Sequence, residues 1–270
     1  MQTMKEIFEE IETNGGMTPS RRLRDIANRF PEQIAFRDKR FGIWNEMSYK
    51  DFWMEVQYVG CALNYFGIQK TEKVAIHSEN RPEWLIADIG VQAIGGITVG
   101  LYPTNPPAEV QYLLSHSESK ILFAEDQEQV DKALEVLDEV PNLSKIIYFE
   151  EKGLFRYDSE KLMRWDEFLE IGKEEYEKNK DFVNFCIDEI KSEDVALMIY
   201  TSGTTGPPKA SMLSHGNMEW TASIIPDLSF TPNISNPEYL SYLPLCHVFG
   251  RLVDEIIACL LYTSDAADDP

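Results

Sequence analysis

Apolar and polar positions between residues 73 and 150 fall into alternating blocks that predict βαβ units. Short runs rich in β-branched residues are followed by longer stretches in which apolar residues recur at helical spacing. The strands are expected at 74–77, 97–102, 121–124 and 146–149, and the helices at 80–94, 109–115 and 127–139. Because strands that alternate with helices pair in parallel, the pattern predicts an α/β fold of doubly wound, mainly parallel sheets flanked by helices.

The pattern changes after residue 150. Residues 151–191 are rich in charged and aromatic side chains and are expected to form a solvated connecting segment, with one helix that opens at Trp165. A buried strand is expected at 195–200, because this stretch is a continuous apolar run. Further along the chain, the sequence predicts a strand at 239–245 and a helix with an apolar face at 252–261.

Composition narrows the classes of function. The chain has 270 residues, 43% of them apolar, and can therefore bury the core of one large domain or two modest ones. With 46 acidic and 25 basic residues its formal charge is −21, which would repel a phosphate backbone, so no nucleic-acid partner is expected. The first residues are acidic and no run of 18 apolar residues occurs, which favours a soluble, cytoplasmic protein.

The cysteines give no sign of a metal site or a disulfide framework. They form no Cys-x-x-Cys pair and lie far apart, at Cys61, Cys186, Cys246 and Cys259. Most of them stand inside apolar runs, so buried free thiols are expected. No metal-binding residue is assigned.

A loop rich in hydroxyl groups follows the expected strand at 195–200. Residues 201–209 contain two glycines that let backbone N–H groups approach an anion, four hydroxyl side chains and a lysine. The candidate phosphate-binding residues are Thr201, Ser202, Gly203, Thr204, Thr205, Gly206 and Lys209. A Walker loop needs four residues between its glycines, whereas only two separate these, so an ordinary P-loop NTPase is a poor interpretation. The alternative is a surface turn.

Several segments together resemble the adenylate-forming enzymes, the superfamily of acyl-CoA synthetases, luciferases and adenylation domains. Tyr200-Thr-Ser-Gly-Thr-Thr-Gly-Pro-Pro-Lys209, continued by Met-Leu-Ser-His-Gly-Asn217, is similar to the signature of this superfamily. Ser-Tyr-Leu-Pro-Leu-Cys-His-Val-Phe-Gly-Arg at 241–251 resembles its Leu-Pro-Leu-x-His element in the long-chain fatty acyl-CoA synthetase form. The stretches 37–44 and 78–104 resemble the same branch, so the likeness covers about residues 18–261.

Two features depart from the family pattern. The loop lysine is followed by Ala210 where members usually have glycine, and this is expected to stiffen the exit of the loop. The chain also stops soon after 241–251, so the resemblance implies a partial large AMP-binding domain over 1–261, an atypical truncated tail at 262–270, and no small C-terminal domain. The family's adenine, ribose and catalytic-lysine elements would then be missing, and the isolated chain is expected to make no acyl-CoA.

The resemblance also assigns roles to single residues. His247 would lie beside the carboxylate being activated, and Lys209 would act on the phosphates, so both are the catalytic candidates. On chemistry alone, a histidine in this position is more often packed and hydrogen-bonded than catalytic. His215 is expected to begin the helix after the loop, with a ligand role as an open alternative, whereas His77 and His116 are expected to be structural.

The implied activity is that of an ATP-dependent long-chain fatty acid–CoA ligase. A fatty-acid carboxylate would attack ATP to form acyl-AMP, and coenzyme A would then displace AMP, with Mg²⁺ assisting the first step. Two alternatives stay open: an aryl- or amino-acid-activating enzyme, and a non-catalytic nucleotide-binding fragment. The stretches 41–44 and 244–251 favour a pocket for long acyl chains. An apolar substrate also leaves peripheral membrane contact open, and the oligomeric state is undetermined.

Overall fold

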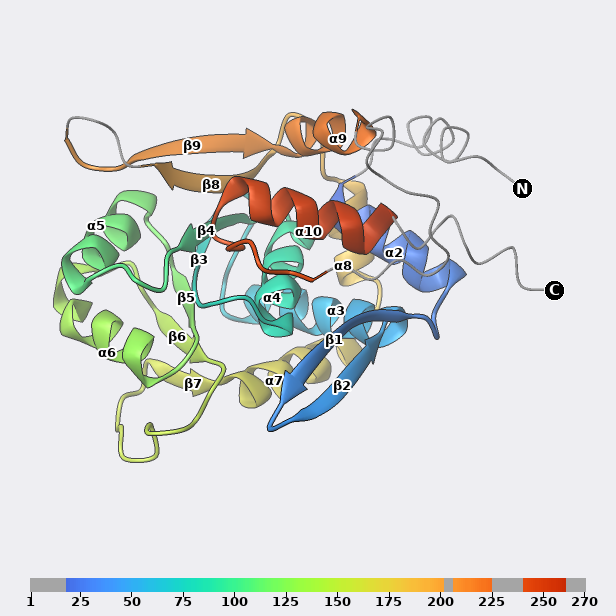
Figure 1. The fold of residues 1–270 in the computed structure, drawn as a ribbon. Coiled ribbons are helices and arrows are strands. Elements are labelled where there is room, and N and C mark those ends of the chain that lie inside the picture. Colours follow the sequence, from blue (N-terminus) through green and yellow to red (C-terminus); the bar gives the residue numbers. More distant parts are fainter. Residues whose placement is uncertain (1–17, 202–205, 225–239, 261–270) are drawn as a thin grey trace.

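A seven-stranded sheet with helices on both faces organises the molecule (Figure 1). The computed structural model describes residues 18–201, 206–224 and 240–260, and of residues 223–224 and 255–260 it describes the backbone alone. The strand order is β7-β6-β5-β3-β4-β8-β9, in which all neighbours are parallel except β8 and β9. The strands are β3 (Lys73–His77), β4 (Ile97–Leu101), β5 (Ile121–Ala124), β6 (Lys145–Tyr148), β7 (Leu162–Arg164), β8 (Val195–Thr201) and β9 (Lys209–Ser214).

Alternate residues of the central strands enter two separate cores. Val74 and Ile76 of β3 face one core while Ala75 faces the other, as expected for a strand that is buried on both faces. The first core is covered by α2 (Pro19–Arg29), α3 (Tyr49–Tyr65), α4 (Pro82–Ala93), α7 (Trp165–Lys178) and α8 (Phe182–Asp188). The second is covered by α5 (Pro107–Ser117), α6 (Gln127–Glu135) and the 3₁₀ helix η1 (Leu137–Glu139). At the β8 end, α9 (His215–Ile224) and α10 (Val248–Leu260) cover the face opposite the second core.

The α/β prediction for residues 73–150 is confirmed element by element. Each of the four expected strands is present within one residue of its predicted bounds, and α4 begins at Pro82, whose fixed φ suits the first helical turn. One difference concerns the expected helix at 127–139, which breaks at Val136 into α6 and η1.

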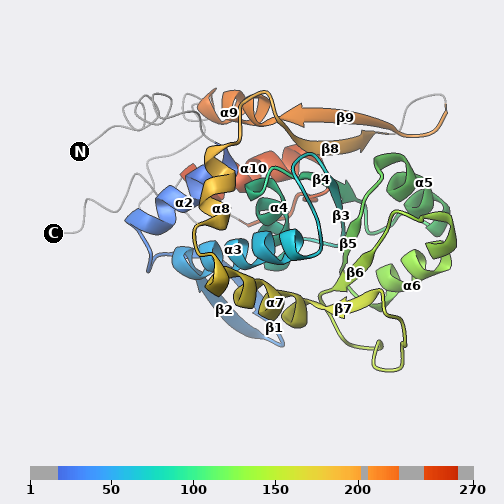
Figure 2. The ribbon, with the colours of Figure 1, turned by 180° about the vertical axis from the view of Figure 1, so that it is seen from behind.

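Residues 151–191 are part of the domain core, so the expectation of a solvated connecting segment is wrong. Strand β7 extends the sheet, and α7 packs along α3, as Figure 2 shows. The rings of Trp165 and Phe168 lie 5.7 and 5.4 Å from that of Phe123 on β5. The charged residues of α7 lie on its outer face. Because they outnumber the buried aromatic residues, the composition of this segment suggested a solvated linker.

A β-hairpin stands apart from the main sheet. It consists of β1 (Ile34–Arg40) and β2 (Ile43–Ser48), paired antiparallel. At its base, the rings of Phe36 and Phe52 lie 4.9 Å apart, which ties the hairpin to α3. The turn residues Phe41 to Trp44 are exposed, and Phe41 lines an open cavity of about 410 Å³ together with Lys39 and Arg81. The expectation that this turn favours a long-chain acyl pocket stays a prediction.

Candidate functional site

The carboxyl ends of β3 and β4 form the point where the chain reverses its direction of winding. From β3 the chain crosses to β4 on one side through α4, and from β4 it returns past β3 to β5 through α5. The two crossover helices lie on opposite faces of the sheet. In open α/β sheets, ligands bind in the crevice that such a reversal leaves at the carboxyl ends of the strands.

Asn80 holds the segment 241–245 in this crevice. Its side-chain Nδ2 donates to the carbonyl oxygen of Leu243 at 2.7 Å and to the hydroxyl of Ser241 at 3.1 Å. Its Oδ1 accepts from the backbone N–H of Leu245 at 3.0 Å. Since Asn80 follows β3 in sequence, one side chain ties a distant segment to the carboxyl edge of the sheet.

The segment 240–247 forms turns and bends instead of the expected strand, and Tyr239 lies outside the described residues. Its backbone groups bond to Asn80 and within the turn, where the N–H of His247 donates to the carbonyl of Pro244 at 3.0 Å. These backbone groups are therefore not free to pair with a neighbouring strand. On the sheet side, a Cβ on Gly100 of β4 would lie 2.9 Å from Cα of Cys246, so only glycine allows this close approach.

His247 is exposed at the N-terminus of α10. Its Nδ1 accepts a hydrogen bond from the backbone N–H of Phe249 at 3.2 Å, so the side chain caps the helix. In the neutral ring, the proton is then on Nε2, which is free to meet a ligand. His247 is exposed and therefore not packed, but it is hydrogen-bonded, as the structural alternative expects. Its role in catalysis stays a prediction.

A buried ion pair fixes α10 against α4. Nε of Arg251 lies 3.1 Å from Oδ2 of Asp88, and both side chains are almost fully buried. The guanidinium carbon lies 4.5 Å from the ring centroid of Trp84, in a cation–π arrangement. These contacts hold the helix that begins at His247 close to the β3–β4 crossover.

The same helix buries a carboxyl group one turn further on. Asp254 is 4% exposed, and the hydroxyl of Ser241 donates to its Oδ2 at 2.7 Å. Burial raises the pKa of Asp254 to about 6. The expected apolar stripe Ile256, Ile257 and Leu260 lies on this helix, but its side chains are outside the described residues.

The hydroxyl-rich loop lies at the carboxyl end of β8, next to β4. Thr201 ends β8 and Lys209 begins β9, and the two are paired across the strands. Both are exposed, and Lys209 forms no ion pair with any described residue. Gly206 has φ +101°, a conformation that favours glycine, and it is exposed. The candidates Ser202, Gly203, Thr204 and Thr205 lie outside the described residues.

Strand β9 was not expected from the sequence, and it explains how Ala210 fits. Ala210 pairs with Tyr200 in the antiparallel ladder, where an extended backbone suits any side chain. The loop therefore leads from one strand of a hairpin into the other.

Two side chains of α5 hold both arms of this loop, and the sequence analysis missed their role. The Tyr112 hydroxyl donates to the carbonyl oxygen of Pro208 at 3.0 Å, and a 2.7 Å hydrogen bond joins Nδ1 of His116 to the hydroxyl of Tyr200. Burial raises the pKa of Tyr200 to about 12, so its hydroxyl keeps its proton at neutral pH. Tyr112 and His116 line a cavity of about 380 Å³ together with Lys209. Helix spacing alone could have shown Tyr112 and His116 on one face, but not what that face meets.

The remaining histidines are buried. His215 begins α9 as expected, is fully buried, and has its pKa lowered to about 4 by burial. Its burial favours a structural role over contact with a ligand. His77 is buried in the same way, and its Nε2 lies 3.0 Å from the carbonyl oxygen of Tyr102. Both histidines are assigned a structural role, and His116 helps to hold the loop through its hydrogen bond to Tyr200. Cys61 and Cys246 are buried free thiols as expected, whereas Cys186 is free but only half-buried. Cys259 lies among the undescribed side chains.

The described part of the chain contains no group of three His, Cys, Asp or Glu side chains that could hold a metal ion. Within the same residues, no helix is both long and apolar enough to cross a membrane.

Comparison with known proteins agrees with this geometry. The family model described as "AMP-binding enzyme" matches residues 23–263. The long-chain-fatty-acid–CoA ligase ACSBG2 of Xenopus laevis is 31% identical over 86% of this chain and 31% of its own length. The human ACSBG2 is also 31% identical, over 88% of this chain and 35% of its own length. The chain thus spans about a third of the length of the curated relatives that it matches.

Solved structures confirm the fold. The N-terminal domain of FACL13 from Mycobacterium tuberculosis superposes with a TM-score of 0.68 at 19% identity, over 90% of this chain and 55% of that one. The anthranilate CoA ligase AuaEII, in complex with anthranoyl-AMP, gives a TM-score of 0.60 at 22% identity, over 78% of this chain and 37% of that one. At these identities the likeness shows the fold, while the family model covers most of the chain. The chain therefore belongs to the AMP-binding enzyme family.

Proposed function

We propose that this chain is the N-terminal part of a long-chain fatty acid–CoA ligase, and that it handles the triphosphate and carboxylate of the first half-reaction. One observation carries the proposal. The segment that ends in His247 and the loop that ends in Lys209 lie at the carboxyl ends of the adjacent parallel strands β4 and β8. These two motifs, far apart in the chain, thus share one edge of the sheet, at the place where open α/β sheets bind ligands.

The proposed reaction has two displacements. A fatty-acid carboxylate oxygen attacks the α-phosphorus of ATP, and the bond to the bridging oxygen breaks to release pyrophosphate and leave acyl-AMP. The thiolate of coenzyme A then attacks the acyl carbon and expels AMP. A carboxylate is a weak nucleophile, so the protein's contribution is to align it and to offset the negative charge on the departing pyrophosphate.

The described residues suit the first displacement. Lys209 places an exposed ammonium, with no ion-pair partner among the described residues, at the mouth of the loop opposite Thr201. His247 presents Nε2–H at the neighbouring strand end, where it can donate to a carboxylate oxygen. Mg²⁺ would enter with the triphosphate, because this part of the chain has no cluster of ligands to hold the ion by itself.

The substrate class rests on the relatives. The curated relatives compared above are long-chain-fatty-acid–CoA ligases, whereas the solved neighbours include an anthranilate CoA ligase. Since the fold alone accommodates different acids, sequence similarity to the curated relatives favours the fatty acid. A cytoplasmic location with peripheral membrane contact is part of the same proposal.

The test is fatty-acid-dependent exchange of labelled pyrophosphate into ATP, measured with the longest open reading frame that contains this sequence. We expect exchange with palmitate and none with benzoate or amino acids. The Lys209→Ala variant should lower the exchange rate by about 10²–10³, which is the usual loss for one charge-stabilising donor. Lys173→Ala, on the exposed face of α7, is the matched control. Exchange that requires an aromatic or amino acid would refute the substrate class, and normal exchange by the Lys209 variant would refute the role of the loop.

A further inference from the structure

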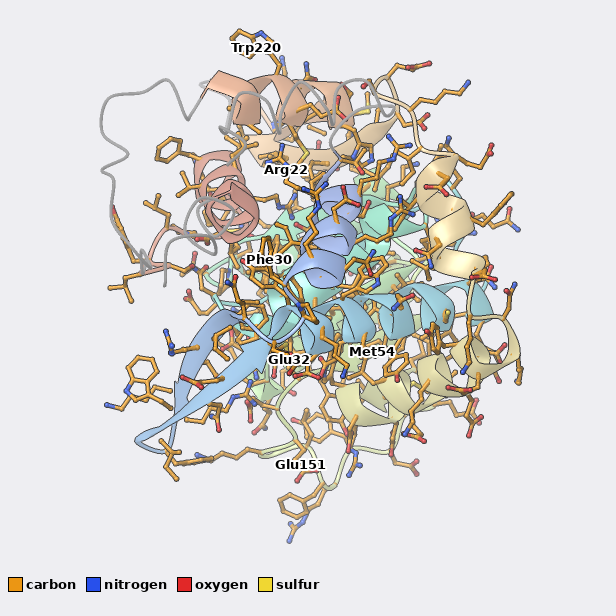
Figure 3. All side chains as sticks on the ribbon, turned by 90° about the vertical axis from the view of Figure 1, so that its right-hand side faces the viewer. Arg22, Phe30, Glu32, Met54, Glu151 and Trp220 are labelled. Atoms are coloured by element: carbon orange, nitrogen blue, oxygen red, sulfur yellow. The ribbon has the colours of Figure 1, made fainter. Side chains whose placement is uncertain are left out.

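The turn of the β1–β2 hairpin exposes three large apolar side chains. Phe41 is completely exposed, and Ile43 and Trp44 are 68% and 61% exposed. In Figure 3 the hairpin extends beyond the helical layer on the same lower side as Glu151. The molecule therefore carries a projecting apolar tip that contributes nothing to its core.

The backbone of this turn is also unfavourable for the residue that it carries. Phe41 has φ +51° and Gly42 has φ +83°, so both residues of a two-residue hairpin turn are left-handed. Such turns fit the twist of the strands, but their first position favours Asn, Asp or Gly, because a side chain with a bulky ring is strained there. Phe41 thus reduces stability twice, through its backbone and through its exposed ring. A strained residue that stability does not explain points to function.

The acidic side chains of the hairpin are neutralised within the protein. Asp38 pairs with Arg40 at 2.6 Å, and Glu46 pairs with Arg37 at 2.8 Å. Arg40 also pairs with Glu83 of α4, which fixes the hairpin against the body of the molecule. The tip is accordingly held in place, and its carboxylates are not left to repel an anionic surface.

Lys39, two positions before the turn residue Phe41, has no such acidic partner among the described residues. The Lys39 ammonium lies 5.6 Å from the ring centroid of Trp44 and forms no ion pair with the rest of the described chain. Residues 37–46 contain three basic and two acidic side chains, although the whole chain has a charge of −21. Arg37 and Arg40 are paired with carboxylates, so Lys39 is the charge that the tip offers to a surface. At physiological ionic strength, charges more than about 8 Å away are largely screened, so distant acidic residues do not cancel this lysine.

We propose that this hairpin tip, formed by Lys39 and residues 41–44, is a membrane-contact site that inserts its apolar side chains into the surface of a bilayer containing anionic lipid. Aromatic side chains favour the boundary between acyl chains and headgroups, and an adjacent lysine is attracted to anionic headgroups. This inference rests on the peripheral membrane contact of the proposed function and gives that contact a site, whereas its binding test is independent of ligase activity. Such a site would bring an enzyme of this family to the phase in which a long-chain acid is dissolved.

The test is flotation of the chain with vesicles of phosphatidylcholine alone and of phosphatidylcholine with 30% phosphatidylserine, at physiological salt. We expect partition into the anionic vesicles, and we expect Phe41→Asn to weaken it by about tenfold, since burial of a Phe side chain favours transfer by at least that factor. The same variant should raise the melting temperature, because Asn suits the left-handed position. If Phe41 only stabilised the fold, Phe41→Asn would lower both the vesicle partition and the melting temperature.

Phe185→Asn is the matched control, because this ring is 66% exposed on α8, away from the hairpin. It should leave partition unchanged. The proposal is overturned by an absence of binding up to millimolar lipid, by equal binding to neutral vesicles, or by binding that Phe41→Asn leaves intact. It is equally overturned if the chain dimerises through the tip, which sedimentation without lipid would show as a dimer that Phe41→Asn converts to a monomer.

Discussion

Replacing Asn80 by alanine should release the segment that carries His247 from the edge of the sheet. Asn80 makes two part-buried hydrogen bonds to this segment, to the carbonyl of Leu243 at 2.7 Å and from the N–H of Leu245 at 3.0 Å. A third, to the hydroxyl of Ser241, is exposed and contributes little. A net value of about 1 kcal/mol for each part-buried bond gives a loss of about 2 kcal/mol.

This loss is local, so global unfolding is not its best measure. A free-energy change of about 2 kcal/mol corresponds to about a 30-fold increase in the population of the opened segment. Amide hydrogen exchange at Leu245 reports that population directly, because its N–H is bonded to Asn80. We expect the exchange rate at Leu245 to rise about 30-fold in Asn80→Ala, while the amides of β3 and β5 keep their protection.

Asn105→Ala provides the matched control. Asn105 lies at the same edge of the sheet, after β4, but its side-chain donor reaches only Glu109 on the adjacent helix. This change should alter the exchange at Leu245 by less than about twofold, because surface substitutions usually cost within about 0.5 kcal/mol. The hypothesis that Asn80 holds the segment 241–245 would be refuted by either of two results. One is an exchange rate at Leu245 of Asn80→Ala within twofold of that of the original chain, and the other is an equal effect of Asn105→Ala.

Three further predictions concern the surroundings of this segment. Asp88→Leu alone should cost about 3–5 kcal/mol in urea unfolding because it leaves the buried Arg251 guanidinium without a counter-ion, and adding Arg251→Met should recover most of that loss; a double variant as unstable as the single one would contradict this. Tyr112→Phe should cost about 1 kcal/mol in the same assay and should slow pyrophosphate exchange, since it removes the bond to Pro208; unchanged exchange would remove Tyr112 from the loop support. The pKa of Asp254 is raised by burial to about 6, so the folded chain holds a proton that the unfolded chain has lost between about pH 4 and 6, and this group makes stability fall as pH rises through that range. Asp254→Asn should therefore gain up to about 3 kcal/mol relative to the original chain between pH 4 and pH 7, and a difference that does not change with pH would show that the carboxyl is not buried in solution.

Much of the central fold could be predicted from local patterns. The strands at 74–77, 97–101 and 121–124 are buried on both faces, so each is a continuous apolar run between turn signals. Such a run is recognisable without knowledge of its partners. The helices between them have caps and spacing that are equally local, as the proline at the start of α4 shows.

The elements that the sequence analysis missed depend on partners that are distant in the chain. From the sequence alone, the residues of β9 look like the polar end of the preceding loop. They form a strand because β8 pairs with them. Trp165 and Phe168 stand in a strongly charged segment, and only their contact with Phe123 of β5 shows that they belong to the core. The segment at 240–247 was expected to be a strand, but Asn80 takes the backbone bonds that a strand would need.

The candidate site divides in the same way. The sequence by itself determined the two motifs of the site, the hydroxyl-rich loop that ends in Lys209 and the element that contains His247. Each motif can be recognised in the sequence because its chemistry is carried by consecutive residues. Only the tertiary structure decided that the two motifs share one edge of the sheet, that α5 holds the arms of the loop, and that the turn at Phe41 faces solvent. The physical reason is that hydrogen-bonding capacity and apolar character belong to single residues, whereas strand order, burial and the choice of partner depend on how the whole chain packs.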